Sequence, residues 1–128
     1  MTEAGTDLAR FIRGEADPAA FPHREHLRMG FELLRRVSFD EAVHRYCVAL
    51  RAMLSRAGNP ASFHQTITIA FLSVIAQRMQ DGGEQEFPAF AAANPDLIDK
   101  SMLTRWYRPE RLASELARRS FVLPDPAF

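Results

Sequence analysis

The stretch Ala61-Ser-Phe-His-Gln-Thr-Ile-Thr-Ile-Ala-Phe-Leu-Ser-Val-Ile-Ala-Gln77 carries no formally charged side chain, and it is apolar almost without interruption from Ile67 to Ala76. It is too long for one ordinary β-strand and no turn signal divides it, so the pattern predicts a helix even though Thr-Ile-Thr-Ile is rich in β-branched residues. A helix that is apolar on all sides is buried by its neighbours. We therefore expect residues 61–79 to form the central helix of the fold.

Apolar residues recur at helical spacing on both sides of this stretch, and Gly or Pro stands near the expected helix ends. The pattern predicts an all-α, single-domain bundle of six or seven helices that spans residues 1–128, a length sufficient for one core. Prolines near the C-terminus predict an extended tail from about residue 120, with Phe121 and Leu123 packed inward. The other expected helices cover about residues 7–13, 23–37, 39–57, 95–105 and 110–119.

The charge balance excludes a global electrostatic field. The chain has 16 basic and 16 acidic side chains, so nothing draws it generally to nucleic acid or to an anionic membrane. The arginines between residues 105 and 119 form a local basic cluster, interpreted as a solvated helix face, with a partner surface as the alternative. The N-terminal residues lack the pattern of a signal peptide, which favours the cytoplasm. The sequence leaves the oligomeric state open, a homodimer included.

Three of the four histidines fall on predicted buried faces. His23 and His26 open the helix that starts near residue 23, and His64 opens the central helix. Two imidazoles three positions apart share one side of a helix, and a third from a neighbouring helix could complete a set of nitrogen ligands for Zn, Fe or Mn with one position left open. Glu25, Asp96 or Asp99 could add a carboxylate, and the spacing selects none of them. The remaining histidine, His44, falls off the apolar stripe and is expected at the surface.

Four further side chains are candidates for binding a ligand. Thr68 lies one turn after His64, where it could bond a ligand or the second ring nitrogen of that histidine. Thr66 could serve a different contact, and Tyr46 and Trp106 could form walls of a pocket, as could Tyr107. The single cysteine, Cys47, lies on an apolar helical stripe and is expected to be buried rather than reactive.

The segments Phe21-Pro-His-Arg-Glu-His-Leu27, Phe63-His-Gln-Thr-Ile-Thr68 and Arg105-Trp-Tyr107 also support a comparison. In them the chain resembles a family of small, uncharacterised, all-helical bacterial proteins with the pattern Phe-x-His-x-x-His-Leu followed by aromatic-His-x-Thr-x-Thr. The resemblance covers about residues 21–124. It implies that the three histidines and the two threonines belong together, and it brings no established activity.

Two functions therefore follow from the sequence. In the first, His23, His26 and His64 hold a divalent metal beside a small-molecule site, and the protein is a metal-dependent enzyme whose reaction the sequence does not identify. In the second, the protein is a non-catalytic module that binds a small ligand or a partner, and the same histidines are internal hydrogen-bonding groups. The sequence contains no phosphate-binding glycine loop, no nucleophile elbow and no Cys-x-x-Cys motif that would add a third.

Overall fold

The computed structural model describes residues 3–126, apart from the side chains of residues 3, 4 and 100. The described residues form helices and connecting turns and contain no β-strand, which confirms the predicted all-α class. No helix in this part of the chain is long and apolar enough to cross a membrane. The α-helices are α1 (Glu3–Ile12), α2 (His23–Leu34), α3 (Phe39–Arg56), α4 (Gln65–Gly82), α5 (Phe87–Ala93), α6 (Pro109–Leu112) and α7 (Glu115–Arg119).

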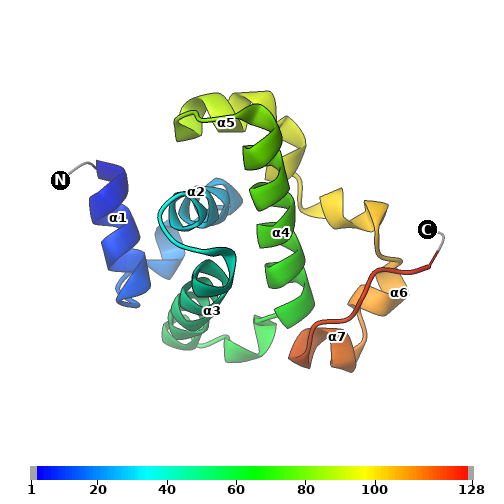
Figure 1. Cartoon of the computed structure of the whole chain (residues 1–128). Coiled ribbons are helices and arrows are strands. Elements are labelled where there is room, and N and C mark those ends of the chain that lie inside the picture. Colours follow the sequence, from blue (N-terminus) through cyan, green and yellow to red (C-terminus); the bar gives the residue numbers. More distant parts are fainter. Residues whose placement is uncertain (1–2, 127–128) are drawn as a thin grey trace.

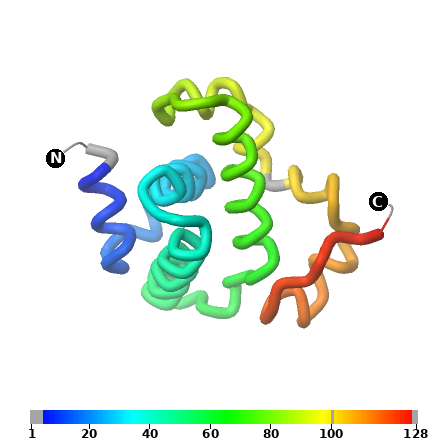
Figure 2. The backbone as a smooth tube through the Cα atoms, viewed as in Figure 1, coloured from blue at the N-terminus to red at the C-terminus, as the bar shows by residue number. Residues whose placement is uncertain are grey.

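Helix α4 is the central element, as predicted. In Figure 1, α2 and α3 lie along one side of α4, whereas α6, α7 and the C-terminal tail lie along the other. Helix α5 crosses the C-terminal end of α4, and α1 packs on α2 and α3 away from α4. The tube in Figure 2 shows that residues of the last quarter of the chain return to the end at which α4 begins. Helix α4 therefore separates a layer of long helices, α2 and α3, from a layer of two short helices and an extended tail.

The predicted ends of the central helix were wrong. Helix α4 begins at Gln65 rather than residue 61, because Pro60–Ser62 forms a separate 3₁₀ turn and His64 is the N-terminal cap. It continues to Gly82, three residues beyond the expected end, and stops where Gly83 adopts a φ of 71° that favours glycine. The shift places His64 at a helix terminus, where its ring can cap backbone groups.

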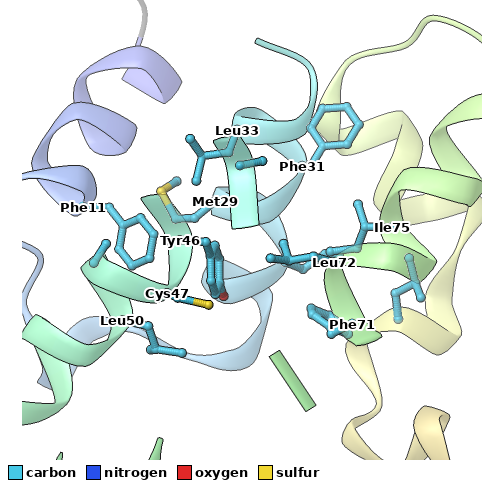
Figure 3. Close-up of a cluster of buried hydrophobic side chains, with 14 of the residues drawn as sticks. Phe11, Met29, Phe31, Leu33, Tyr46, Cys47, Leu50, Phe71, Leu72 and Ile75 are labelled. Carbon is cyan, nitrogen blue, oxygen red and sulfur yellow. The ribbon is translucent and has the colours of Figure 1, made fainter. Parts of the chain in front are cut away.

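The core lies between α4 and the first three helices. Leu72 and Ile75 project from α4 toward Tyr46 of α3, and Phe11 of α1 lies on the other side of the Tyr46 ring (Figure 3). Gly30 of α2 faces the same layer: a Cβ there would stand 2.9 Å from the Leu72 Cδ2 and 3.1 Å from the Ile75 Cδ1. Glycine at this position therefore lets α2 and α4 approach closely.

The C-terminal third is more broken than the sequence predicts. The helix expected after Asn94 is two 3₁₀ segments, Pro95–Ile98 and Lys100–Arg105, and the expected last helix divides into α6 and α7. The tail is extended as predicted, but its expected packing was wrong: Phe121 and Leu123 are exposed, whereas Val122 packs on the core. Alternation in an extended chain explains the difference, because only every second side chain can face inward.

Candidate functional site

All three histidines of the predicted site line one cavity of about 470 Å³. Its walls come from four segments: the start of α2 with the residues before it, the middle of α3, the start of α4, and residues 99–103. Most of the wall is apolar, and its polar lining residues include the three histidines, Thr68 and Asp99. Histidines from parts of the chain about forty residues apart therefore share one cavity.

His23 and His26 stand side by side at the start of α2. Their ring centroids are 6.2 Å apart, and both rings are half-buried. The His23 ring also contacts Phe71 of α4 at 5.2 Å, and the His26 ring meets Phe21 edge-on at 4.7 Å. Pro22 caps α2 in an extended conformation, so the helix begins at His23 and both histidines fall in its first turn, one turn apart on the same side.

Hydrogen bonds fix the protons of these two rings. The Nε2 of His23 lies 3.2 Å from the Leu97 carbonyl oxygen, which only accepts, so this nitrogen carries the proton. The Tyr46 hydroxyl donates to the His26 carbonyl at 3.2 Å and lies 3.3 Å from the His26 Nδ1, so Nδ1–H donates to the phenol oxygen. Burial raises the pKa of Tyr46, which keeps this hydroxyl protonated.

His64 is committed to the fold through both ring nitrogens. Its Nδ1 accepts the Ile67 backbone N–H at 3.1 Å, and its Nε2–H donates to the Leu112 carbonyl at 2.7 Å. The first bond caps α4, and the second satisfies a carbonyl at the C-terminal end of α6. A metal ion at this ring would need a nitrogen lone pair that one of these bonds now uses.

The predicted ligand-binding residues divide into two groups. Tyr46 and Thr68 line the cavity. The sequence suggested a bond from Thr68 to a ligand or to the His64 ring, but the Thr68 hydroxyl donates to the His64 backbone carbonyl at 2.7 Å. Thr66 and Trp106 are not among the lining residues. Thr66 binds the C-terminal tail instead, and Trp106 is exposed. Tyr107 is buried, with its hydroxyl on the Val122 carbonyl.

Of the three candidate carboxylates, only Asp99 lines the cavity. Glu25 pairs with Arg28, and Asp96 pairs with Arg78. The pKa of Asp99 is lowered, first by the Ser101 backbone N–H and to a smaller extent by the positive potential of His23. Asp99 also caps the 3₁₀ segment Lys100–Arg105 through the Ser101 N–H.

The side chains that the structure describes contain no group of three or more His, Cys, Asp or Glu residues placed to hold a metal ion. The Zn, Fe or Mn site at His23, His26 and His64 therefore stays a prediction. Two other expectations are confirmed: Cys47 is buried, which raises the pKa of its thiol, and His44 is exposed.

No protein-family model matches the chain, and comparisons with curated proteins and with solved structures give no match. The resemblance to small bacterial helical proteins likewise stays a prediction, and the argument for function depends on the geometry of the cavity.

Proposed function

We propose that the protein binds a small, mainly apolar molecule in the cavity beside His23 and His26, and that His64 is a structural residue of its wall. The observation that carries the proposal is the cavity itself. Aromatic and aliphatic side chains form most of its surface, and a few imidazole, hydroxyl and carboxylate groups converge on it. That combination is typical of small-molecule sites, where apolar walls supply affinity and a few polar groups fix orientation.

The different contacts of the three histidines support this assignment over a three-histidine metal centre. His64 uses both nitrogens inside the protein, so a metal ion there would compete with the α4 cap or with the bond to Leu112. His23 and His26 form the part of the wall that combines aromatic contact with hydrogen-bonding nitrogens. We assign these two rings to ligand recognition and assign no reaction.

Binding of an uncharged fluorescent probe, N-phenyl-1-naphthylamine, tests the proposal. Ile67 lines the cavity and is 40% exposed, so Ile67→Trp places a bulky indole ring where the cavity meets the surface. Leu116→Trp is the matched control, because Leu116 is also an exposed apolar residue and lies outside the cavity lining. We expect the wild type and the control to enhance probe fluorescence and the Ile67 variant to lose the enhancement. Equal enhancement in all three would contradict the assignment.

Imidazole resonances provide a second readout. Titration with the same probe should shift the ring signals of His23 and His26, whereas those of His44, which is outside the cavity lining, should stay unchanged. Metal analysis of protein purified without a histidine tag tests the metal alternative separately. We expect no stoichiometric metal and no change in melting temperature with chelator; a metal that is lost in the His23→Ala/His26→Ala/His64→Ala variant would support that alternative instead.

A further inference from the structure

The arginines of this protein differ in what neutralises them. Most have a carboxylate oxygen within 4.0 Å, among them Arg28, Arg35, Arg36, Arg45, Arg78, Arg105 and Arg111. Arg51 of α3 and Arg118 of α7 have no such ion pair with any described side chain, and their hydrogen bonds go only to uncharged groups. Two positive charges in this part of the molecule therefore lack a counter-charge.

Both guanidinium groups are held against the same residue, Phe63. The Arg51 guanidinium carbon lies 4.4 Å from the centroid of the Phe63 ring, and its Nη2 donates to the Gln65 side-chain oxygen at 3.1 Å. Arg118 Nη1 donates to the backbone carbonyls of Ala61 at 3.0 Å and of Phe63 at 3.3 Å. These hydrogen bonds use one nitrogen of each guanidinium, which carries five N–H donors in all.

The two arginines line an open hollow of about 660 Å³. Pro60, Ala61 and Phe63 also line it, as do Arg119 and Glu115 of α7. Arg119 and Glu115 lie 3.7 Å apart with both side chains about 70% exposed, so water screens that pair strongly. Three arginines and one glutamate thus line the hollow.

We propose that this hollow binds an oxyanion of the phosphate or sulfate type. A guanidinium presents its N–H groups as a planar fork that matches such an anion, and the strongest hydrogen bonds form where both partners are charged. Neutral contacts hold Arg51 and Arg118 in place, so an anion would find both groups already positioned. The interpretation of the basic C-terminal segment as a solvated face therefore fits Arg105 and Arg111, which pair with Asp96 and Asp125, and not Arg118.

The oxyanion site is separate from the cavity of the proposed function, although one short segment serves both. Ser62 and His64 line the cavity, whereas Ala61 and Phe63 line the hollow. Phe63 and His64 are both in extended conformation, in which successive side chains face opposite ways. Loss of probe binding in the cavity variant would leave the oxyanion proposal standing, and the reverse also holds.

Calorimetric titration with inorganic phosphate at constant ionic strength tests the site. Arg51→Gln and Arg118→Gln should each weaken phosphate binding about tenfold, the loss expected for one charge-assisted hydrogen bond. Arg24→Gln is the matched control, because Arg24 also stands over a ring, that of Phe87 at 5.1 Å, has no ion pair with a described carboxylate and lies outside the hollow. Arg118→Lys, which keeps the charge but not the fork, should fall between wild type and Arg118→Gln.

Melting temperatures separate binding from folding. Arg118→Gln loses two contacts to the backbone, whereas Arg51→Gln changes an exposed side chain, so the Arg51 variant should remain as stable as the control. A parallel titration with phenyl phosphate identifies the source: tighter binding than phosphate points to a phosphate ester, and equal binding points to the free anion. No phosphate binding by the wild type at millimolar concentrations, or equal binding by all variants, would overturn the proposal.

Discussion

The two sides of α4 are attached to the rest of the protein in different ways. On the side of α2 and α3, fully buried apolar residues such as Leu72 and Ile75 fill the interface. On the opposite side, polar groups at the start of α4 bind backbone atoms of the C-terminal region. Thr66 donates to the Ser120 carbonyl at 2.7 Å and accepts the Val122 N–H at 3.1 Å, and His64 donates to the Leu112 carbonyl.

The difference follows from how far the backbone N–H and C=O groups on each side of α4 are paired within their own segment. Long helices such as α2 and α3 pair most of their N–H and C=O groups internally, so they need only apolar contacts from α4. The region after Pro109 consists of two short helices and an extended tail. Short helices and extended chain leave many backbone groups without a partner in their own segment. Buried polar groups on α4 supply those partners. The few polar residues of an otherwise apolar helix therefore indicate which side meets irregular chain.

The largest effect is expected on the apolar side, where Leu72→Ala should lower the free energy of unfolding by about 2–5 kcal/mol. Gly30 sharpens the test, because its missing Cβ would meet the Leu72 Cδ2 at 2.9 Å. Gly30→Ala alone should destabilise by about 1 kcal/mol, since overpacking of about 1–3 kcal/mol exceeds the gain in helix propensity of about 1 kcal/mol. In the Leu72→Ala background it should be neutral or stabilising. Urea unfolding of all four proteins measures the coupling, and strictly additive costs would refute the contact.

On the polar side, Thr66→Val removes the hydroxyl but keeps the shape of the buried side chain. It leaves the Ser120 carbonyl and the Val122 N–H without their partner, at a cost of about 1–3 kcal/mol. Hydrogen exchange should show faster exchange at Val122 and unchanged protection in α2. Thr104→Val is the control, because its exposed hydroxyl bonds only the nearby Ser101 carbonyl. A Thr66 variant as stable as this control would mean that the hydroxyl does not hold the tail.

The sequence predicted the apolar side of the fold well. Helical periodicity depends on local spacing, so it located α2, α3 and α4 and assigned Cys47 to the core. It failed at ends and in irregular chain. Pro60–Ser62 forms a turn that the uncharged composition of the stretch concealed, and the break between α6 and α7 has no breaker residue other than Ser114, which caps α7.

For the candidate site, the sequence predicted which histidines share a location but not what their nitrogens do. Helical periodicity placed all three histidines on inward faces, and the structure has His23 and His26 half-buried in the first turn of α2 and His64 buried as the cap of α4. The partners of His64 do not follow from periodicity, because the Leu112 carbonyl is 48 residues away and its availability depends on where α6 ends. The partners of Thr66 could not be predicted for the same reason: they belong to a tail whose path local patterns do not define.

His64 provides a finer test of the polar side. His64→Ala should lower the free energy of unfolding by about 1–2 kcal/mol in metal-free protein, because the Ile67 N–H and the Leu112 carbonyl lose their partner. His64→Asn should recover part of this loss, since asparagine caps helices well but is too short to reach α6. His44→Ala, at an exposed position of α3, should change stability by less than about 0.5 kcal/mol. Thermal unfolding with and without chelator measures all three; a chelator effect on wild type alone would favour the metal alternative.

The smallest effect is expected at the C-terminal end of α4, where Arg78 binds both carboxylate oxygens of Asp96 at 2.9 and 3.1 Å. This contact lowers the pKa of Asp96, so the folded state binds a proton on that residue less readily than the unfolded chain does. The stabilisation is therefore fully present above about pH 4, the ordinary pKa of aspartate, and is lost as the pH falls through the lowered pKa.

Asp96→Asn should cost about 0.5–1 kcal/mol at neutral pH, because both side chains are partly exposed, and little at low pH. Denaturant unfolding as a function of pH measures the difference, with Glu110→Gln, at an exposed position of α6, as the control. A cost for Asp96→Asn that stays constant across that pH range would show that the pair acts through packing and not through charge.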